Sequence, residues 1–170
     1  MKIRILGKSV LTKTVTSLSM VILLLTLVPS TYASKPTPVT WHADFTFFFD
    51  TFRTAGGNGI FTGHNTGAFS GALAGPSGGL GEGVFHFQSN LVTFHDVETC
   101  TCTVAGHSGS LVLVLSLTGP VDSPPFFGHW TIISCTGGLA TLHGEGTISG
   151  TVQTDGTGLA DYVGNIHFDP

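Results

Sequence analysis

The stretch VFHFQSNLVTFHDVETCTCTVAGHSGSLVLVLSL, residues 84–117, alternates apolar and polar side chains over three segments that are separated by short turns. Alternation with a period of two is typical of β-strands, whose successive side chains point to opposite faces of a sheet. Ser89-Asn90 and the segment Ala105–Ser108 carry turn-forming residues, so they predict two hairpins. We therefore expect three adjacent antiparallel strands.

The lengths of these turns predict a register, which continues into a fourth strand across a longer loop through Pro124-Pro125. The expected pairs are Phe87 with Val92, Phe85 with Phe94, Cys102 with Leu111, Cys100 with Leu113, Glu98 with Leu115, Leu111 with Cys135, Leu113 with Ile133, Leu115 with Thr131 and Leu117 with His129. Residues that are paired directly in antiparallel strands point to the same side. One face of the sheet is therefore predicted to be apolar, and a slip of one residue would destroy this pattern.

The opposite face is predicted to be mostly polar. It collects His86, Thr93, His95, Thr99, Thr101, Thr103, Ser116 and Ser134, and it is interrupted by the apolar residues Val112, Val114, Trp130 and Ile132. The segments near residues 41–50 and 161–168 alternate in the same way, with Trp41 and Tyr162 on the apolar side. No segment after residue 33 has a clear helical period. A sheet without helices must cover its own apolar face, so we predict a single antiparallel β-barrel of about seven to eight strands over residues 41–170.

The first 33 residues have the layout of a secretory signal peptide. Basic residues come first, an apolar run follows over residues 20–28, and small residues end at Ala33. The run is much shorter than the roughly 20 residues that a membrane-spanning helix needs. We expect cleavage after Ala33, an extended leader over residues 34–40, and a secreted protein that is free of the membrane.

The charge of the remaining segment argues against several partners. Only Lys35 and Arg53 are basic after residue 33, against ten acidic residues, so the formal net charge of this segment is −8 with histidine neutral. Such a surface repels phosphate backbones, which excludes nucleic acid as an expected partner. The sequence contains no dinucleotide fingerprint, phosphate loop or nucleophile elbow, and its eight histidines form no H-x-H or H-x-x-x-H pair. We expect no metal and no cofactor.

Three cysteines in an exported chain suggest one disulfide and one free thiol. In the predicted register, however, Cys102 and Cys135 lie on strands that are not neighbours, too far apart for a disulfide. Cys100 and Cys102 are two residues apart on one strand, close to the geometric limit. We expect three buried apolar thiols; a disulfide and metal ligation are the alternatives.

Several motifs resemble an uncharacterised bacterial domain family that is grouped with the allene oxide cyclase-like barrels. The motifs are AFSGALAG (68–75), GEG (81–83), VE (97–98), GHSGSL (106–111), WTII (130–133) and TGGLATLHGEGT (136–147). The resemblance implies a small antiparallel barrel with a central cavity, in a superfamily that includes cyclases of lipophilic substrates and dirigent-type proteins. It does not supply catalytic residues.

The predicted apolar face offers one candidate site, at the end where polar residues join it. Glu98 and His129 are the candidate catalytic groups, since a carboxyl group among apolar side chains acquires a pKa near neutrality. The candidate ligand-binding residues are Phe85, Phe87, Phe94, Glu98, Leu113, Leu115, Thr131 and Ile133. This arrangement predicts a protein that binds a small lipophilic molecule, with or without an isomerase or cyclase reaction. The alternative is a non-catalytic extracellular structural or interaction module, whose outer apolar residues could pair with another copy of the chain.

Overall fold

The computed structural model describes residues 34–121 and 125–170, and the predicted signal peptide lies outside these residues. The described chain forms eight strands and no helix. The strands are β1 (Thr37–Ala55), β2 (Asn58–Gly71), β3 (Leu73–His86), β4 (Leu91–Val104), β5 (His107–Pro120), β6 (Phe126–Gly137), β7 (Leu142–Val152) and β8 (Thr157–Phe168). Within this part of the chain, no helix is long and apolar enough to span a membrane.

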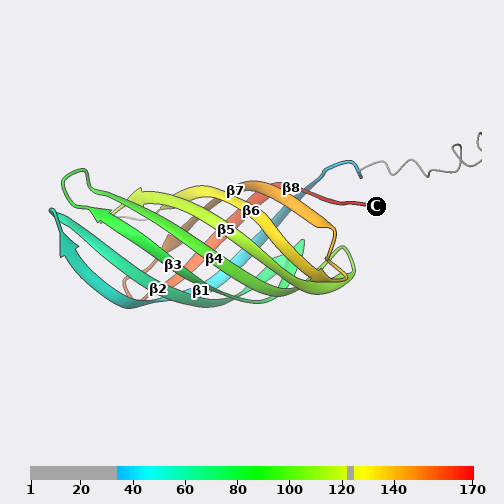
Figure 1. The fold of residues 1–170 in the computed structure, drawn as a ribbon, viewed down its shortest axis with the longest axis horizontal. Helices are drawn as coiled ribbons and strands as arrows, with labels where there is room; N and C mark the ends of the chain where they lie inside the picture. The colour runs from blue at the N-terminus through cyan, green and yellow to red at the C-terminus, as the bar shows by residue number, and fades with distance from the viewer. Residues whose placement is uncertain (1–33, 122–124) are drawn as a thin grey trace, which may run out of the picture. The chain divides into compact units, whose positions relative to one another are not determined.

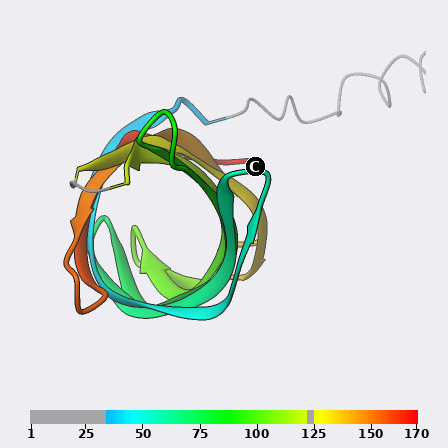
Figure 2. The same cartoon turned by 90° about the vertical axis from the view of Figure 1, so that its left-hand side faces the viewer.

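Each strand pairs antiparallel with the next one in the sequence, and β8 pairs with β1, so the sheet closes on itself (Figures 1 and 2). The predicted all-β antiparallel barrel is confirmed. β1 begins at Thr37, which pairs with Ile166, so most of the segment 34–40 belongs to the wall of the barrel. Closure gives every strand two neighbours and leaves no edge strand that could recruit another chain.

The hairpins of the central strands differ from the predicted register by two residues. Phe85 pairs with Val92, because the turn between β3 and β4 includes residues 87–90 rather than Ser89-Asn90 alone. Cys100 pairs with Leu111, because the next turn is only Ala105-Gly106, both with positive φ. A two-residue hairpin of this kind suits the twist of antiparallel strands. A shift of two preserves the side to which each residue points, so the predicted inner face of these strands holds.

The prediction for β6 is wrong because of a β-bulge. The register between β5 and β6 shifts between Val112 and Leu113, so Leu113 pairs with Ile132 and Leu115 with Trp130. The extra residue in β6 reverses the side of everything that precedes it in that strand. Trp130 and Ile132, expected outside, are therefore buried in the barrel. His129, Thr131 and Ile133, expected inside, are exposed, and Ile133 is 58% accessible.

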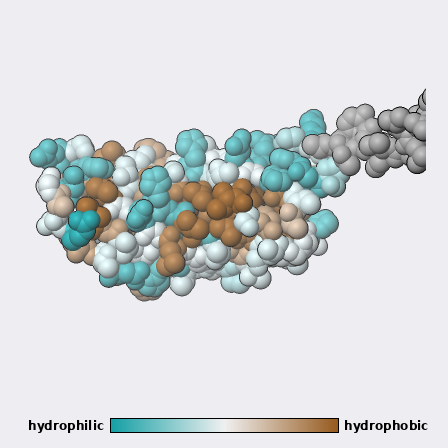
Figure 3. Space-filling view, in the orientation of Figure 1, coloured by the Kyte–Doolittle hydropathy of each residue, from teal (hydrophilic) through white to brown (hydrophobic). Residues whose placement is uncertain are grey.

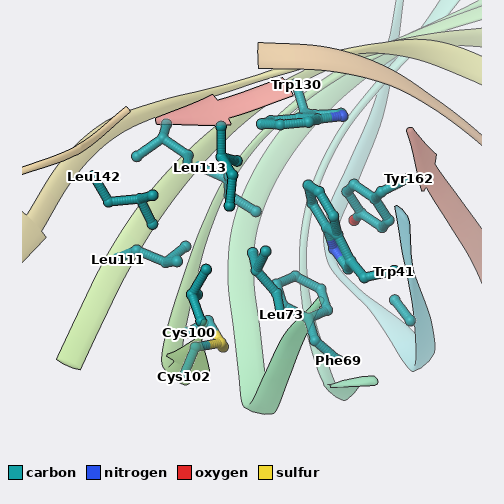
Figure 4. Packing of buried hydrophobic residues seen from close by; sticks show 14 of the residues in the cluster. Trp41, Phe69, Leu73, Cys100, Cys102, Leu111, Leu113, Trp130, Leu142 and Tyr162 are labelled. Carbon is teal, nitrogen blue, oxygen red and sulfur yellow. A yellow bond between two sulfur atoms is a disulfide. The ribbon is translucent and has the colours of Figure 1, made fainter. Parts of the chain in front are cut away.

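Aromatic rings pack across the barrel in its middle. Trp41 of β1 stacks on Tyr162 of β8 with ring centroids 4.7 Å apart, and it meets Trp130 of β6 edge-on at 4.6 Å (Figure 4). All three side chains are buried almost completely. Contacts between strands that are not neighbours fill the lumen at this level, as is usual for a barrel of eight strands.

Glycines of the wall make room for several of these rings. A Cβ atom at Gly81 would overlap the ring of Phe94, and one at Gly83 would overlap the ring of Phe61. The ring of Trp130 lies in the same way against Gly146 and Gly164. The high glycine content of the chain thus has a packing role, in addition to its role in turns.

The expectation of three free thiols is wrong. Cys100 and Cys102 form a disulfide within β4, with their Cα atoms 5.4 Å apart (Figure 4). Residues two apart on a strand point to the same side, and this spacing lies within the range that a disulfide accepts. Cys135 is free and half-buried, and its Sγ donates a hydrogen bond to the Leu142 carbonyl oxygen.

Candidate functional site

Two carboxyl groups are buried inside the barrel on β4. Asp96 is 3% exposed and Glu98 is 4% exposed, and both point inward because they alternate in step with Phe94 and Cys100. Such a location is rare for acidic side chains, which are almost never fully buried unless they are paired. No cationic side chain among the described residues contributes to the pKa of either acid.

The carboxyl group of Asp96 accepts a hydrogen bond from a side-chain amide on β2, two strands away in the sheet. Asn65 of β2 donates a hydrogen bond from Nδ2 to Asp96 Oδ2 at 2.7 Å. Gly79 of β3 lies between them in the sheet, and a Cβ atom there would collide with both side chains. Burial raises the pKa of Asp96 to about 6, although the hydrogen bonds from Asn65 and from the Val97 backbone act to lower it.

Glu98 interacts with a residue from the far side of the barrel. Tyr162 of β8, the strand that lies opposite β4 in the ring, is close enough to lower the pKa of Glu98, so this interaction crosses the lumen. Burial raises the pKa of Glu98 to about 7, and the negative charge of Asp96 adds to this, while Ser77 and Tyr162 act to lower it. The pKa of Tyr162 is raised well above its ordinary value, mainly by burial, so its hydroxyl group stays protonated as a donor.

Some buried polar atoms of this cluster have no hydrogen bond of normal geometry with any described residue. They are Asn65 Oδ1, Ser77 Oγ, Asp96 Oδ1 and Trp41 Nε1. Buried polar atoms are nearly always hydrogen-bonded, so each exception calls for a partner. The two carbonyl-type oxygen atoms, Asn65 Oδ1 and Asp96 Oδ1, belong to side chains that are hydrogen-bonded to each other, and each can accept a further hydrogen bond.

Phenylalanine rings gather at the end of the barrel formed by the β1–β2 and β3–β4 turns. The linked rings are Phe47, Phe49, Phe52, Phe61, Phe85, Phe87 and Phe94, with centroid separations of 4.6–6.3 Å. We call this set the phenylalanine cluster. Phe94 is the inward residue next to Asp96 on β4, so the cluster adjoins the acid pair. Phe49, Phe52 and Phe87 are 60%, 55% and 49% exposed, so the outer part of the cluster meets solvent.

The predicted site residues fall into two groups. Phe85, Phe87 and Phe94 belong to the phenylalanine cluster, and Glu98 faces the lumen with Leu113 and Leu115 on the adjacent strand. His129, Thr131 and Ile133 do not join them, because the bulge places them on the outer surface.

The sequence-based interpretation missed Asp96, Asn65 and Ser77. Asp96 could have been found, since it precedes Glu98 by two residues on the same face of the strand. Asn65 and Ser77 come from β2 and β3, in glycine-rich segments that offered no register. Their place beside the acids depends on the pairing of β2, β3 and β4.

The outer surface offers weaker candidates. One shallow groove includes His95, Ser116 and His129, and another includes Asp44 and Leu159, but neither contains a buried acid. Histidines elsewhere on the surface pair with aspartates: His64 pairs with Asp50 at 2.8 Å, and His143 and His167 both pair with Asp169. Among residues 34–121 and 125–170, no three potential metal ligands converge on one point.

Comparison with known proteins gives a family and related folds. The family model described as "Protein of unknown function (DUF3224)" matches residues 50–162. A DUF3224 protein of unknown function from Shewanella oneidensis MR-1 has a similar structure, with a TM-score of 0.62 and 20% sequence identity over 80% of this chain and 100% of the other.

Two pterocarpan synthase dirigent proteins, GePTS1 and PsPTS1, share the fold at 13% identity. Their TM-scores are 0.53 and 0.51, and the matches cover 81% and 82% of this chain and 94% and 99% of theirs. No curated protein matches the chain significantly. The resemblance to an uncharacterised barrel family is confirmed: since the family model spans more than half of the sequence, the chain belongs to the DUF3224 family.

Proposed function

We propose that this protein binds a small lipophilic molecule at the end of the barrel that carries the phenylalanine cluster. The main supporting observation is that this cluster lies next to the buried acid pair, since Phe94 precedes Asp96 by two residues on the inward side of β4. Exposed aromatic rings offer a large apolar contact area, and a few polar groups at the base of such a site fix the orientation of the ligand. The likeness in fold to dirigent proteins supports a role for the lumen, without supplying a substrate.

The acid pair suits proton transfer. A group transfers protons best when its pKa lies near the working pH, and the pKa values of Asp96 and Glu98 are about 6 and about 7. One acid can donate a proton while the other accepts one, because two adjacent carboxyl groups do not readily ionise together. An isomerase or cyclase acting on a lipophilic substrate uses this chemistry. We place this activity outside the cell, on the basis of the predicted signal peptide.

Binding is tested with a neutral aromatic probe, 1-naphthylmethanol, titrated into the mature segment and followed by calorimetry. We expect saturable binding that Phe87→Ala weakens. The matched control is Phe127→Ala, because Phe127 is 52% exposed against 49% for Phe87 but lies on the outer surface, away from the cluster. Absence of saturable binding, or equal weakening by both substitutions, would refute the proposal.

An interaction module is the second candidate, and an outer apolar patch favours it. Leu80, Val97 and Val114 are paired in a row across β3, β4 and β5, and Leu80 and Val97 are 69% and 48% exposed. Figure 3 shows an apolar patch near the middle of this face. A patch of this kind can bury against another copy of the chain. Sedimentation over a wide concentration range decides: a strictly monomeric protein would exclude self-association through this patch.

A further inference from the structure

We infer that the ligand of the lumen site is a lipophilic cation, with an ammonium group that docks on Asp96 and an apolar part that packs in the phenylalanine cluster. This inference rests on the proposed function, and it names the chemical class of the ligand. It follows from the hydrogen-bonding needs of Asn65 and Asp96, the charge of the acid pair and the aromatic rings that come next to it on β4.

Two of the unpaired buried atoms, on Asn65 and Asp96, are acceptors only. Asn65 is 8% exposed and donates its Nδ2 to Asp96, which leaves Asn65 Oδ1 and Asp96 Oδ1 without donors. An ammonium group carries donors only, so it can satisfy both oxygen atoms at once. A hydroxyl group has a single hydrogen and can satisfy only one of them.

The charge of the site points the same way. The groups that face the acid pair are Asn65 from β2, Ser77 from β3, Leu113 and Leu115 from β5 and Tyr162 from β8. None of these is a cation, so the two buried carboxyl groups lie side by side with no positively charged side chain among the groups that shift their pKa values. A bound cation would supply the missing charge, and it would displace protons that the acids otherwise retain.

The aromatic lining suits the same ligand. Phe94, the next inward residue on β4, stacks on Phe61 at 5.6 Å and meets Phe47 edge-on at 5.4 Å. Aromatic faces attract cations, and the attraction grows when water is excluded. A cation docked on Asp96 would therefore lie next to the ring of Phe94, the adjacent inward residue of β4.

The test compares 1-naphthylmethylamine with 1-naphthylmethanol, which share the aromatic part and differ in charge. At about pH 8 we expect the amine to bind at least about tenfold more tightly than the alcohol, because Asp96 is then ionised. Below about pH 6 the affinity for the amine should fall steeply, by as much as about tenfold per pH unit, while that for the alcohol stays nearly constant. At about pH 6, where Asp96 is half protonated, calorimetry in buffers of different ionisation enthalpy should also detect proton release with the amine alone.

Variants separate the role of Asp96 from the charge of the whole chain. Asp96→Asn should abolish the preference for the amine, and the fluorescence of the buried Trp41 and Trp130 should show that the variant is folded. Asp44→Asn removes the same charge from the exposed side of β1 and should keep the preference. Glu98→Gln, which leaves Asp96 in place, should reduce the preference without abolishing it.

The outcomes are distinguishable. If the alcohol binds as well as the amine at about pH 8, or if Asp96→Asn retains the preference, the inference is overturned and the lumen site stands. If neither probe binds, the proposed function fails and the inference falls with it.

Discussion

Raising the pH from about 4 to about 8 should lower the free energy of unfolding of this barrel, because two buried acids resist ionisation. The pKa of Asp96 is about 6 against an ordinary value of 3.8, and that of Glu98 is about 7 against 4.5. Below the ordinary values both acids are neutral in the folded and the unfolded chain, so they cost nothing. Between the ordinary and the raised value the unfolded chain loses protons that the folded chain keeps, and stability falls. Above about pH 7 the loss is complete and the curve flattens.

The size of the effect follows from these differences. At about 1.4 kcal/mol per pKa unit, each acid lowers the stability by about 3 kcal/mol across this range. The two contributions are coupled, since the charge of Asp96 raises the pKa of Glu98, so removal of one acid also relieves the other. Asp96→Asn should therefore be more stable than the parent at about pH 8, by as much as about 3 kcal/mol, and nearly equal to it at about pH 4.

Urea unfolding followed by tryptophan fluorescence, at several pH values between about 4 and about 8, measures the effect. Trp41 and Trp130 lie in the middle of the barrel and report the loss of its packing. Asp44→Asn is the control, because this exposed acid should leave the pH dependence unchanged. A stability that is flat or rises over this range, or an Asp96→Asn variant that keeps the dependence of the parent, would refute the reasoning.

Further predictions concern the disulfide, the bulge and the glycines. Denatured protein should expose one thiol, that of Cys135, before reduction and three after it; three before reduction would contradict the Cys100–Cys102 bond. Trp130→Ala should cost about 3–5 kcal/mol in urea unfolding, since the ring is buried, whereas Thr131→Ala next to it should change little; the reverse order would contradict the bulge. Gly83→Ala should cost about 1–3 kcal/mol, because its methyl group would overlap Phe61, and a melting temperature equal to that of the parent would count against this packing.

The inner face of β3, β4 and β5 could be predicted from alternation alone, because the errors in the register were shifts of two residues. The side chains of β6 could not be placed by counting, because a bulge has no signature in residue spacing. The composition of β6 held a better guide than the turn length did: Trp130 and Ile132 are large and apolar, while His129 and Thr131 between and beside them are polar.

Only one of the two buried acids was predicted from the sequence. Glu98 was placed in the lumen correctly, but Asp96 was passed over although it shares the same face. The interaction between Glu98 and Tyr162 links strands on opposite sides of the ring, so no local pattern could reveal it. The Cys100–Cys102 bond was judged unfavourable from its short spacing, although the strand brings the Cα atoms within the usual range.

The rings that lie against glycines in the barrel wall have a consequence for how such a sequence can vary. The Phe61 ring lies where a side chain at position 83 would lie, and the Phe94 ring lies where a side chain at position 81 would lie. A larger residue at either glycine is compatible with the fold only if the ring on the neighbouring strand becomes smaller. Among relatives of this chain, we therefore expect these positions to covary in size, so that glycine in one strand accompanies an aromatic residue in the next.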